Sequence, residues 1–192
     1  MIVRYLKRTC DKGTIISPRS DLNLDLYVDA DFSGLYGAVE DSNPDSVKSR
    51  SGYTIMLAGC HLLSKSVLQT SIACSTLEAE YSALSFALKT LLPVKRLLRE
   101  IVKALDLEAS SMDTSIRARV FEDNQGAYYL ATKQRLTNRT KYFLVGFHWF
   151  WSFYPEEFDI IKCASRDQLA DYFTKGLTRE LFENNRRGVQ GW

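Results

Sequence analysis

The first hydrophobic pattern in the chain has a period of two. In LNLDLYVD, residues 22–29, apolar side chains alternate with others and share one face, which is typical of a half-buried β-strand. These side chains are Leu22, Leu24, Leu26 and Val28. The predicted strand ends in Asp29 and Asp31, although aspartate is a poor strand residue. Either turn chemistry or a metal site would explain two carboxylates at this position.

Further strand-like segments follow a polar turn cluster. Residues 51–59 and 61–67 predict a hairpin across Gly59, and QTSIACS, residues 69–75, predicts a third short strand. These segments together predict an antiparallel meander.

The apolar spacing changes to three or four residues after Thr76, which predicts a long helix. We expect a kink or break at Pro93, inside this pattern. The apolar positions of the helix are Leu84, Leu88, Leu91, Val94, Leu98, Val102 and Leu105.

Strand and helix patterns alternate in the second half of the chain. The predicted order is a strand at 116–123, helices at 124–133 and 140–154, a strand at 157–165 and a helix at 166–177. Consecutive strands followed by this alternation predict an α/β fold, with a mixed sheet flanked by helices. Residues 1–20 have too few apolar positions to form a core, so we expect the domain to occupy 21–192.

Composition argues against some classes of protein but does not identify the function. The 25 basic and 23 acidic residues leave a net charge of +2, too balanced to indicate a nucleic-acid partner alone. The four cysteines form no CxxC pair and there are two histidines, which argues against a zinc site or a disulfide framework. The most hydrophobic stretch, 143–154, is shorter than the ~20 residues of a membrane span. We therefore expect an intracellular protein with no membrane partner.

Four carboxylates occupy comparable places in this outline: Asp29, Glu80, Asp123 and Asp171. Two would end neighbouring strands and two would face them from helices, near the edge where α/β sheets place their sites. Such a group repels itself unless cations neutralise it, and oxygen-only ligands favour Mg²⁺ or Mn²⁺ over zinc.

Each acid also has an ordinary structural interpretation. Asp29 or Asp31 can end a strand, Glu78 or Glu80 can favour a helix N-terminus, and Asp123 can cap a helix. Asp167 can likewise cap the final helix, and Asp171 can lie on an exposed face. Only the joint pattern favours an active site.

Five motifs in order carry a specific resemblance. They are residues 28–34 (VDADFSG), 50–53 (RSGY), 75–81 (STLEAEY), 123–125 (DNQ) and 167–175 (DQLADYFTK). From about residue 22 to the end, the chain resembles the ribonuclease H domain of copia-type LTR retrotransposon Pol polyproteins. Residues 1–20 resemble the tail of the preceding reverse transcriptase or connection segment.

The resemblance implies that Asp29, Glu80, Asp123 and Asp171 are both the catalytic and the metal-binding residues. It favours Glu80 over Glu78 and Asp171 over Asp167, from the residues around each acid, with Asp31 as an auxiliary group. One departure is Tyr142, where family members usually have a histidine.

The implied activity is hydrolysis of the RNA strand of RNA–DNA hybrids with two metal ions, about 3.5–4 Å apart. The implied partners are the hybrid and the reverse transcriptase domain of the same polyprotein, in the cytoplasm within a virus-like particle or in the nucleus. Side chains near the site are candidates for contacts to 2′-hydroxyls and phosphates, although helix capping or a solvated surface role would also explain them. They are Ser75, Thr76, Asn124, Gln125, Lys65, Arg139 and Lys141.

Two other functions remain open at this stage. The first is a catalytically decayed retrotransposon module that acts only as a scaffold or hybrid-binding domain. The second is a different nuclease on the same fold, such as a junction nuclease or an integrase. Strand-transfer relatives normally use three acids, so the fourth acid favours ribonuclease H.

Overall fold

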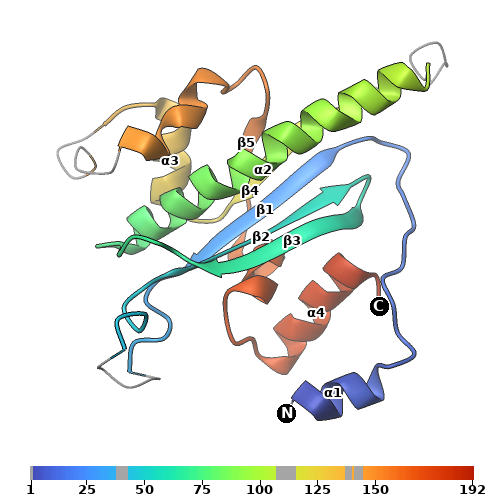
Figure 1. Ribbon diagram of the computed structural model, residues 1–192, viewed down its shortest axis with the longest axis horizontal. Coiled ribbons are helices and arrows are strands. Elements are labelled where there is room, and N and C mark those ends of the chain that lie inside the picture. Colours follow the sequence, from blue (N-terminus) through green and yellow to red (C-terminus); the bar gives the residue numbers. More distant parts are fainter. Residues whose placement is uncertain (1, 38–42, 107–115, 137–139, 141–144) are drawn as a thin grey trace.

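Five strands form one mixed sheet in the order β3-β2-β1-β4-β5 (Figure 1). The strands are β1 (Leu24–Asp31), β2 (Arg50–Leu57), β3 (Cys60–Leu68), β4 (Ala118–Glu122) and β5 (Asp159–Lys162). Strands β1, β2 and β3 pair antiparallel, whereas β4 and β5 run parallel to β1. The predicted fold class, three antiparallel strands followed by parallel strands, is confirmed.

The computed structural model describes residues 2–37, 43–106, 116–136, 140 and 145–192.

The central strand β1 is buried on both faces. Leu26 and Val28 belong to the hydrophobic core, and the intervening Asp25 and Asp29 are buried as well. The strand is present, but the expectation that it is only half buried is wrong, because helical segments cover both faces of the sheet. Leu22 lies before the strand begins.

The predicted hairpin is present, and Ala58 and Gly59 form its turn. Both residues have positive φ, 52° and 76°, as a two-residue hairpin turn requires. The additional strand expected at 69–75 is not formed. There the Gln69 side chain donates to Ser51 Oγ at 2.9 Å and to the carbonyl oxygen of Ala79 at 2.8 Å, so the chain leaves the sheet and turns towards the next helix.

The predicted long helix is α2, Thr76–Ala104, and Ser75 caps it by accepting from the amide of Glu78 at 3.2 Å. The helix continues through Pro93, where we expected a kink or break, without interruption. Pro93 is exposed, so water can solvate the carbonyl group of Lys89 that loses its amide partner. Neither α2 nor any other helix in the described ranges has the length and apolar character to cross a bilayer.

Helical segments form a layer on each side of the sheet (Figure 1). Helices α2 and α3 (Gln125–Lys133) pack together and against β1, β2, β4 and β5. The 3₁₀ segment η5 (Leu169–Phe173) and helix α4 (Arg179–Gln190) lie on the opposite side. Helix α1 (Ile2–Arg8) has no buried residue, but its Tyr5 contacts Phe182 of α4, with ring centroids 5.7 Å apart. The N-terminal segment therefore packs beside the C-terminal helix.

Two predicted helices are replaced by 3₁₀ turns. Within 140–154, the described part contains η2 (Val145–Phe147) and η3 (Trp149–Ser152), because neighbouring aromatic side chains turn towards α2 together. In 166–177, the expected helix is replaced by η4 (Ser165–Asp167) and η5, interrupted where Gln168 turns its side chain into the sheet. Asp171 therefore lies in a 3₁₀ segment, and the last helix is α4.

Candidate metal centre

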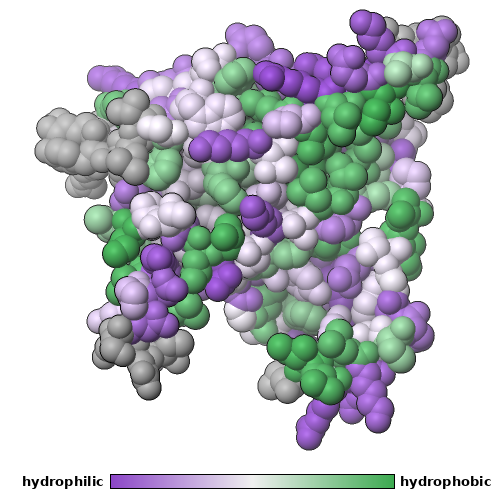
Figure 2. Space-filling view, viewed as in Figure 1, coloured by the Kyte–Doolittle hydropathy of each residue, from purple (hydrophilic) through white to green (hydrophobic). Residues whose placement is uncertain are grey.

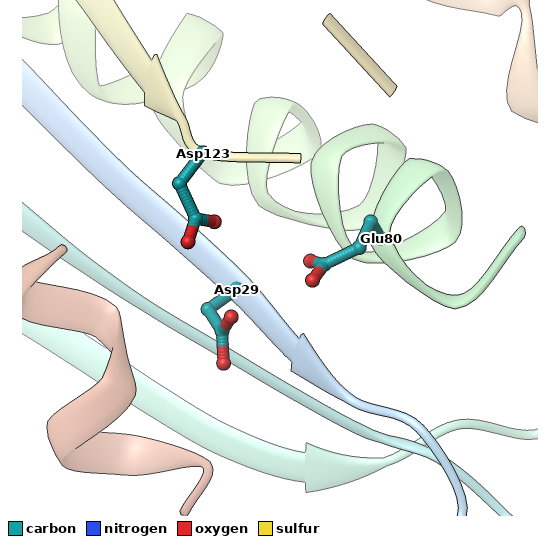
Figure 3. A group of neighbouring side chains, drawn as sticks. All are labelled: Asp29, Glu80 and Asp123. Carbon is teal, nitrogen blue, oxygen red and sulfur yellow. The ribbon is translucent and has the colours of Figure 1, made fainter. Parts of the chain in front are cut away.

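Three of the four predicted acids converge at one edge of the sheet (Figure 3). Asp29 lies near the end of β1, Asp123 directly follows β4, and Glu80 lies in the first turns of α2. One carboxylate oxygen from each lies within 4.8 Å of the others. Because β1 and β4 are parallel, their carboxyl ends meet at the same edge, where α/β folds place their sites.

The opening between the strands comes from the end of their pairing. The register of β1 and β4 stops at Tyr27 and Phe121, just before the two aspartates. The Gln168 side-chain amide donates to the carbonyl oxygens of Val28, at 2.9 Å, and Phe121, at 3.4 Å. One buried side chain therefore satisfies both carbonyls and supports the strand ends from the η5 side.

Asp29 is held by two neighbours in sequence from the far end of the chain. Its side chain is 1% exposed, the Thr174 hydroxyl donates to Oδ2, and Lys175 Nζ lies 2.9 Å from Oδ1. Lys175 Nζ also lies 3.0 Å from Asp171 Oδ1. Asp171 is thus joined to Asp29 through Lys175 and lies outside the group of three carboxylates. Burial and the charge of Asp29 raise the pKa of Asp171 to about 6, although Lys175 opposes the shift.

Glu80 is buried and oriented by the backbone of β1. Its Oε2 accepts from the amide of Ala30 at 2.7 Å. Burial is the largest cause that raises its pKa, to about 10, and the charges of Glu122, Asp29 and Asp123 add to the shift. Glu80 therefore keeps a proton near neutral pH unless a cation replaces it.

The neighbouring Glu78 has a different task. Its Oε2 accepts from the amide of Cys74 at 2.8 Å, so it stabilises the turn before α2. This geometry agrees with the preference for Glu80 as the acid that faces the strand ends.

The donor set fits hard divalent cations. Three clustered carboxylates offer only oxygen, and two of the three are fully buried from solvent or nearly so. Mg²⁺ and Mn²⁺ prefer oxygen ligands, and their charge would offset both the burial and the neighbouring negative charges that keep Glu80 protonated.

Glu122 is an acid that the sequence analysis missed. It is fully buried, its Oε1 accepts from the amide of Asn124 at 3.0 Å, and its Oε2 has no hydrogen-bond partner among the described residues. Burial raises its pKa well above the usual range. The period of two in β4 is the signal for it, because Glu122 falls on the same buried face as Ala118 and Val120. Its bond to Asn124 spans Asp123 and fixes the turn that carries it.

The two rival aspartates lie outside the group of three. Asp167 is exposed and pairs with Arg166 at 3.6 Å. Asp31 ends β1 in a partly buried position. Its pKa is raised, chiefly by burial, although the charge of Lys175 opposes the shift.

The predicted substrate-contacting residues are only partly described. Ser75 and Asn124 use their side chains to cap α2 and α3, and Thr76 and Gln125 begin these helices. Lys65 is exposed on β3, with its Nζ 5.0 Å from the ring centroid of Phe86. Arg139 and Lys141, like Tyr142, lie outside the described residues.

Curated relatives of the chain are plant transposon polyproteins. Over 183 residues, 95% of its length, the chain is 31% identical to the retrovirus-related Pol polyprotein from transposon TNT 1-94 of Nicotiana tabacum. Over 190 residues, 98% of its length, the chain is 28% identical to the corresponding polyprotein from transposon RE2 of Arabidopsis thaliana. The chain spans about 12% of the length of either relative. No family model matches the sequence.

The chain superposes on two solved structures with TM-scores below 0.5. The N-terminal RNase H domain of Rv2228c from Mycobacterium tuberculosis superposes with a TM-score of 0.48 at 12% identity, over 87% of the chain and 98% of that structure. RNase H1 from Halobacterium salinarum superposes with a TM-score of 0.46 at 16% identity, over 84% and 98%.

Proposed function

Because the chain is homologous to retrovirus-related Pol polyproteins of plant transposons, as its motifs predict, we propose that it is a ribonuclease H-type nuclease. Its substrate would be the RNA strand of an RNA–DNA hybrid, and its place in the element's life would be reverse transcription. The copia type implied by the motifs is part of the same proposal.

The convergence of Asp29, Glu80 and Asp123 within 4.8 Å is the observation that carries this proposal. These acids come from three elements that are far apart in the sequence, and each is oriented by the surrounding structure. A buried carboxylate group is costly to maintain, so its presence at the sheet edge favours a role in binding cations.

Asp29, Glu80 and Asp123 would hold the cations, with Asp171 at the border of the group. Two Mg²⁺ or Mn²⁺ ions would supply activation of a water molecule and neutralisation of the charge that develops on the phosphodiester. The protein's own share is positioning. Thr174 and Lys175 orient Asp29, the amide of Ala30 orients Glu80, and the turn closed by Glu122 orients Asp123.

Recognition of RNA would use groups around this edge. Ser75 and Thr76 at the start of α2, and Asn124 and Gln125 at the start of α3, flank Glu80 and Asp123 along the chain. Hydroxyl and amide groups there are suited to 2′-hydroxyl contacts, which distinguish RNA from DNA. Lys65, Arg139 and Lys141 would contact phosphates.

The wider assignment also belongs to the proposal. Residues 1–20 would be the tail of a reverse transcriptase or connection segment, and 21–192 the nuclease domain. The reverse transcriptase domain would then be a partner within one polyprotein, in a cytoplasmic virus-like particle or in the nucleus.

A labelled RNA–DNA hybrid tests the function directly. With Mg²⁺ or Mn²⁺ the wild-type protein should cut the RNA strand, and Asp123→Asn should lower the rate by at least about a hundredfold because it removes a cation ligand. Asp159→Asn is a matched control, since Asp159 is an exposed acid on the neighbouring strand β5.

Three other outcomes are informative. Equal cleavage by wild type and Asp123→Asn would reject the assigned site. Hybrid binding without cleavage by wild type would favour the decayed module. Cleavage of DNA junctions in place of hybrids would favour another nuclease.

A further inference from the structure

The segment before β1, residues 2–19, runs beside the C-terminal helix and is attached to the fold at several points. The amide of Ile15 donates to the carbonyl oxygen of Gln190, at the end of α4, at 2.9 Å. The amide of Arg19 donates to the carbonyl oxygen of Ala58, in the β2–β3 turn, at 2.8 Å. Figure 1 shows this segment descending from the start of β1 past the C-terminus, with α1 beneath α4. We call residues 2–19 the N-terminal strap.

One aromatic residue fixes helix α1 in this strap. Within residues 2–20, all of which the structure describes, only Tyr5 and Thr9 are partly buried. The Thr9 hydroxyl donates to the carbonyl oxygen of Tyr5 at 2.9 Å. Figure 2 shows hydrophobic side chains at the lower edge of the molecule, over α1, where three apolar residues are exposed. These residues are Ile2, Val3 and Leu6. A helix of seven residues is not stable alone in water, so the position of α1 depends on Tyr5.

An aromatic row leads from Tyr5 to η5. The ring centroids of Tyr5 and Phe182 are 5.7 Å apart, and those of Phe182 and Tyr172 are 5.2 Å apart. Burial raises the pKa of Tyr172 to about 12, and the charge of Tyr5 and its hydrogen bond add to the shift. Tyr172 directly follows Asp171. The aromatic row, which consists of Tyr5, Phe182 and Tyr172, therefore ends one residue from the candidate metal centre.

The segment η5 depends on contacts with other elements. The hydrogen bonds of a 3₁₀ turn are poorer than those of an α-helix, so the orientation of Asp171 depends on what packs against the turn. The Ser66 hydroxyl donates to the carbonyl oxygen of Phe173 at 2.6 Å. Leu169 lies against α4 at Gly188, where a Cβ would be 2.6 Å from Leu169 Cδ2. The aromatic row supports the part of η5 between these two contacts.

A movement of η5 would reach Asp29. The amides of Thr174 and Lys175 both donate to the carbonyl oxygen of Asp171, at 3.3 Å and 3.1 Å. The side chains of Thr174 and Lys175 are the groups that hold Asp29. A displacement of Tyr172 would therefore move Asp171 together with the turn that orients Asp29.

We propose that Tyr5 is a positioning residue for the candidate metal centre. Through the aromatic row it holds η5 so that Asp171 and Lys175 face Asp29. The inference rests on the proposed function only for the reaction that the centre performs. The N-terminal strap then contributes to the geometry of the centre, although none of its residues lies among the clustered acids.

Hydrogen exchange tests the positioning without cation or substrate. In EDTA, Tyr5→Ala should speed exchange of the Thr174 and Lys175 amides by about tenfold, because the turn that they close opens more often. Tyr5→Phe keeps the ring against Phe182, so its exchange should stay within about twofold of wild type. The amides of β1 should exchange at wild-type rates in both variants, which would show that the change is local.

Mn²⁺ titration and cleavage kinetics give a second readout. Tyr5→Ala should weaken Mn²⁺ binding by about fivefold and lower kcat by a similar factor, because the groups that orient Asp29 are displaced. The KM for the hybrid should not change, and Tyr5→Phe should restore both values. A role of Tyr5 in stability alone would lower the Tm and leave Mn²⁺ affinity and kcat unchanged, which would overturn the proposal.

Val3→Ala is the matched control, because Val3 is an exposed apolar residue of the same helix. It should leave exchange, Mn²⁺ affinity and kcat unchanged. Equal losses from Val3→Ala and Tyr5→Ala would overturn the proposal, as would wild-type exchange in Tyr5→Ala.

A double-mutant cycle tests the path through Phe182. Phe182→Ala should weaken Mn²⁺ binding, and adding Tyr5→Ala should cause little further loss, because both residues act through the same row. Fully additive losses would overturn this path.

The same variants separate the positioning role from the nuclease proposal. If Tyr5→Ala speeds exchange and weakens Mn²⁺ binding while the wild type cuts no RNA, the positioning role stands and the nuclease proposal fails. If the wild type cuts RNA and Tyr5→Ala matches it in exchange, Mn²⁺ affinity and kcat, the nuclease proposal stands and the positioning role fails.

Discussion

Lys175 Nζ lies 2.9 Å from Asp29 Oδ1, and this ion pair joins the centre of the sheet to the C-terminal segment. The same ammonium group lies 3.0 Å from Asp171 Oδ1. Burial opposes its charge, but the attraction of Asp29 and Asp171 raises the pKa of Lys175 overall. Lys175 is therefore an internal cation that balances the two carboxylates when no metal is bound.

Replacing this internal cation should expose the repulsion between the acids. We expect Lys175→Met to lower the free energy of unfolding by about 1–2 kcal/mol in EDTA, because Asp29 and Asp171 lose their cation. The loss stays modest because the lysine is partly exposed and water screens the ion pair. Saturating Mg²⁺ should recover part of the loss. Chemical denaturation measures both values, with Lys162→Met on the exposed part of β5 as the control. A variant as stable as wild type in EDTA would show that Lys175 does not balance the acids.

Stability should fall with rising pH in the cation-free protein. Glu80 and Asp171 have pKa values of about 10 and about 6, above the ~4 of the unfolded chain. Between pH 4 and these values the folded state holds more protons, so its free energy of unfolding decreases as pH rises. The Tm in EDTA should therefore be lower at pH 8 than at pH 5.5, and Mg²⁺ should raise it more at pH 8.

Glu80→Gln isolates the contribution of this one group to the pH dependence. The variant cannot lose a proton from this position, so its Tm should vary less between the two pH values. An identical pH profile for wild type and Glu80→Gln would contradict a protonated Glu80.

Glu122 should act through its shape more than through its charge. Because burial keeps it neutral, Glu122→Gln should leave thermal stability nearly unchanged, whereas Glu122→Ala should cost about 1–3 kcal/mol. Alanine removes the acceptor for the amide of Asn124 and leaves a cavity. Isothermal titration should also show weaker Mg²⁺ binding by the alanine variant, since the turn that carries Asp123 loosens. Equal effects of both substitutions would assign the role to the charge.

Gly52 leaves room for the segment that holds Asp29. A Cβ at this position would lie 2.5 Å from Thr174 Cγ2 and 3.0 Å from Phe173 Cβ. Gly52→Ala should therefore displace Thr174 from Asp29, lower stability by about 1–3 kcal/mol and slow cleavage of the hybrid. Gly146→Ala is the control, because nothing lies within 4 Å of its new methyl group. Normal cleavage by Gly52→Ala would show that the Thr174 contact is dispensable.

Local patterns predicted the elements that dominate the fold. The period of two in β1 and the long apolar helix pattern of α2 reflect burial against each other, so both were found from sequence. The aromatic segment was misread, because its side chains reach partners on another element. Tyr81 bonds to His148 at 2.9 Å and Ser85 to Trp149, and such contacts leave no periodic signature.

The candidate site, like the fold, was predicted in part, and the part that was missed depends on contacts between distant segments. The motifs named Asp29, Glu80 and Asp123, and the structure brings them together, but their catalytic role stays a prediction. The separation of Asp171 behind Lys175 depends on a 3₁₀ turn that replaces an expected helix. Sequence patterns alone do not show how such a turn aims its side chains.

The reach of Gln168 across 140 residues to the Val28 carbonyl has a consequence for any shortened form of the protein. A chain that stopped before Ser165 would lose more than the distal aspartate and its lysine. Two carbonyls in the interior would be left without a donor, and the ends of β1 and β4, whose pairing stops at Tyr27 and Phe121, would lose the side chain that joins them. Such a fragment would be an unfinished sheet, and its acidic edge would have no defined shape.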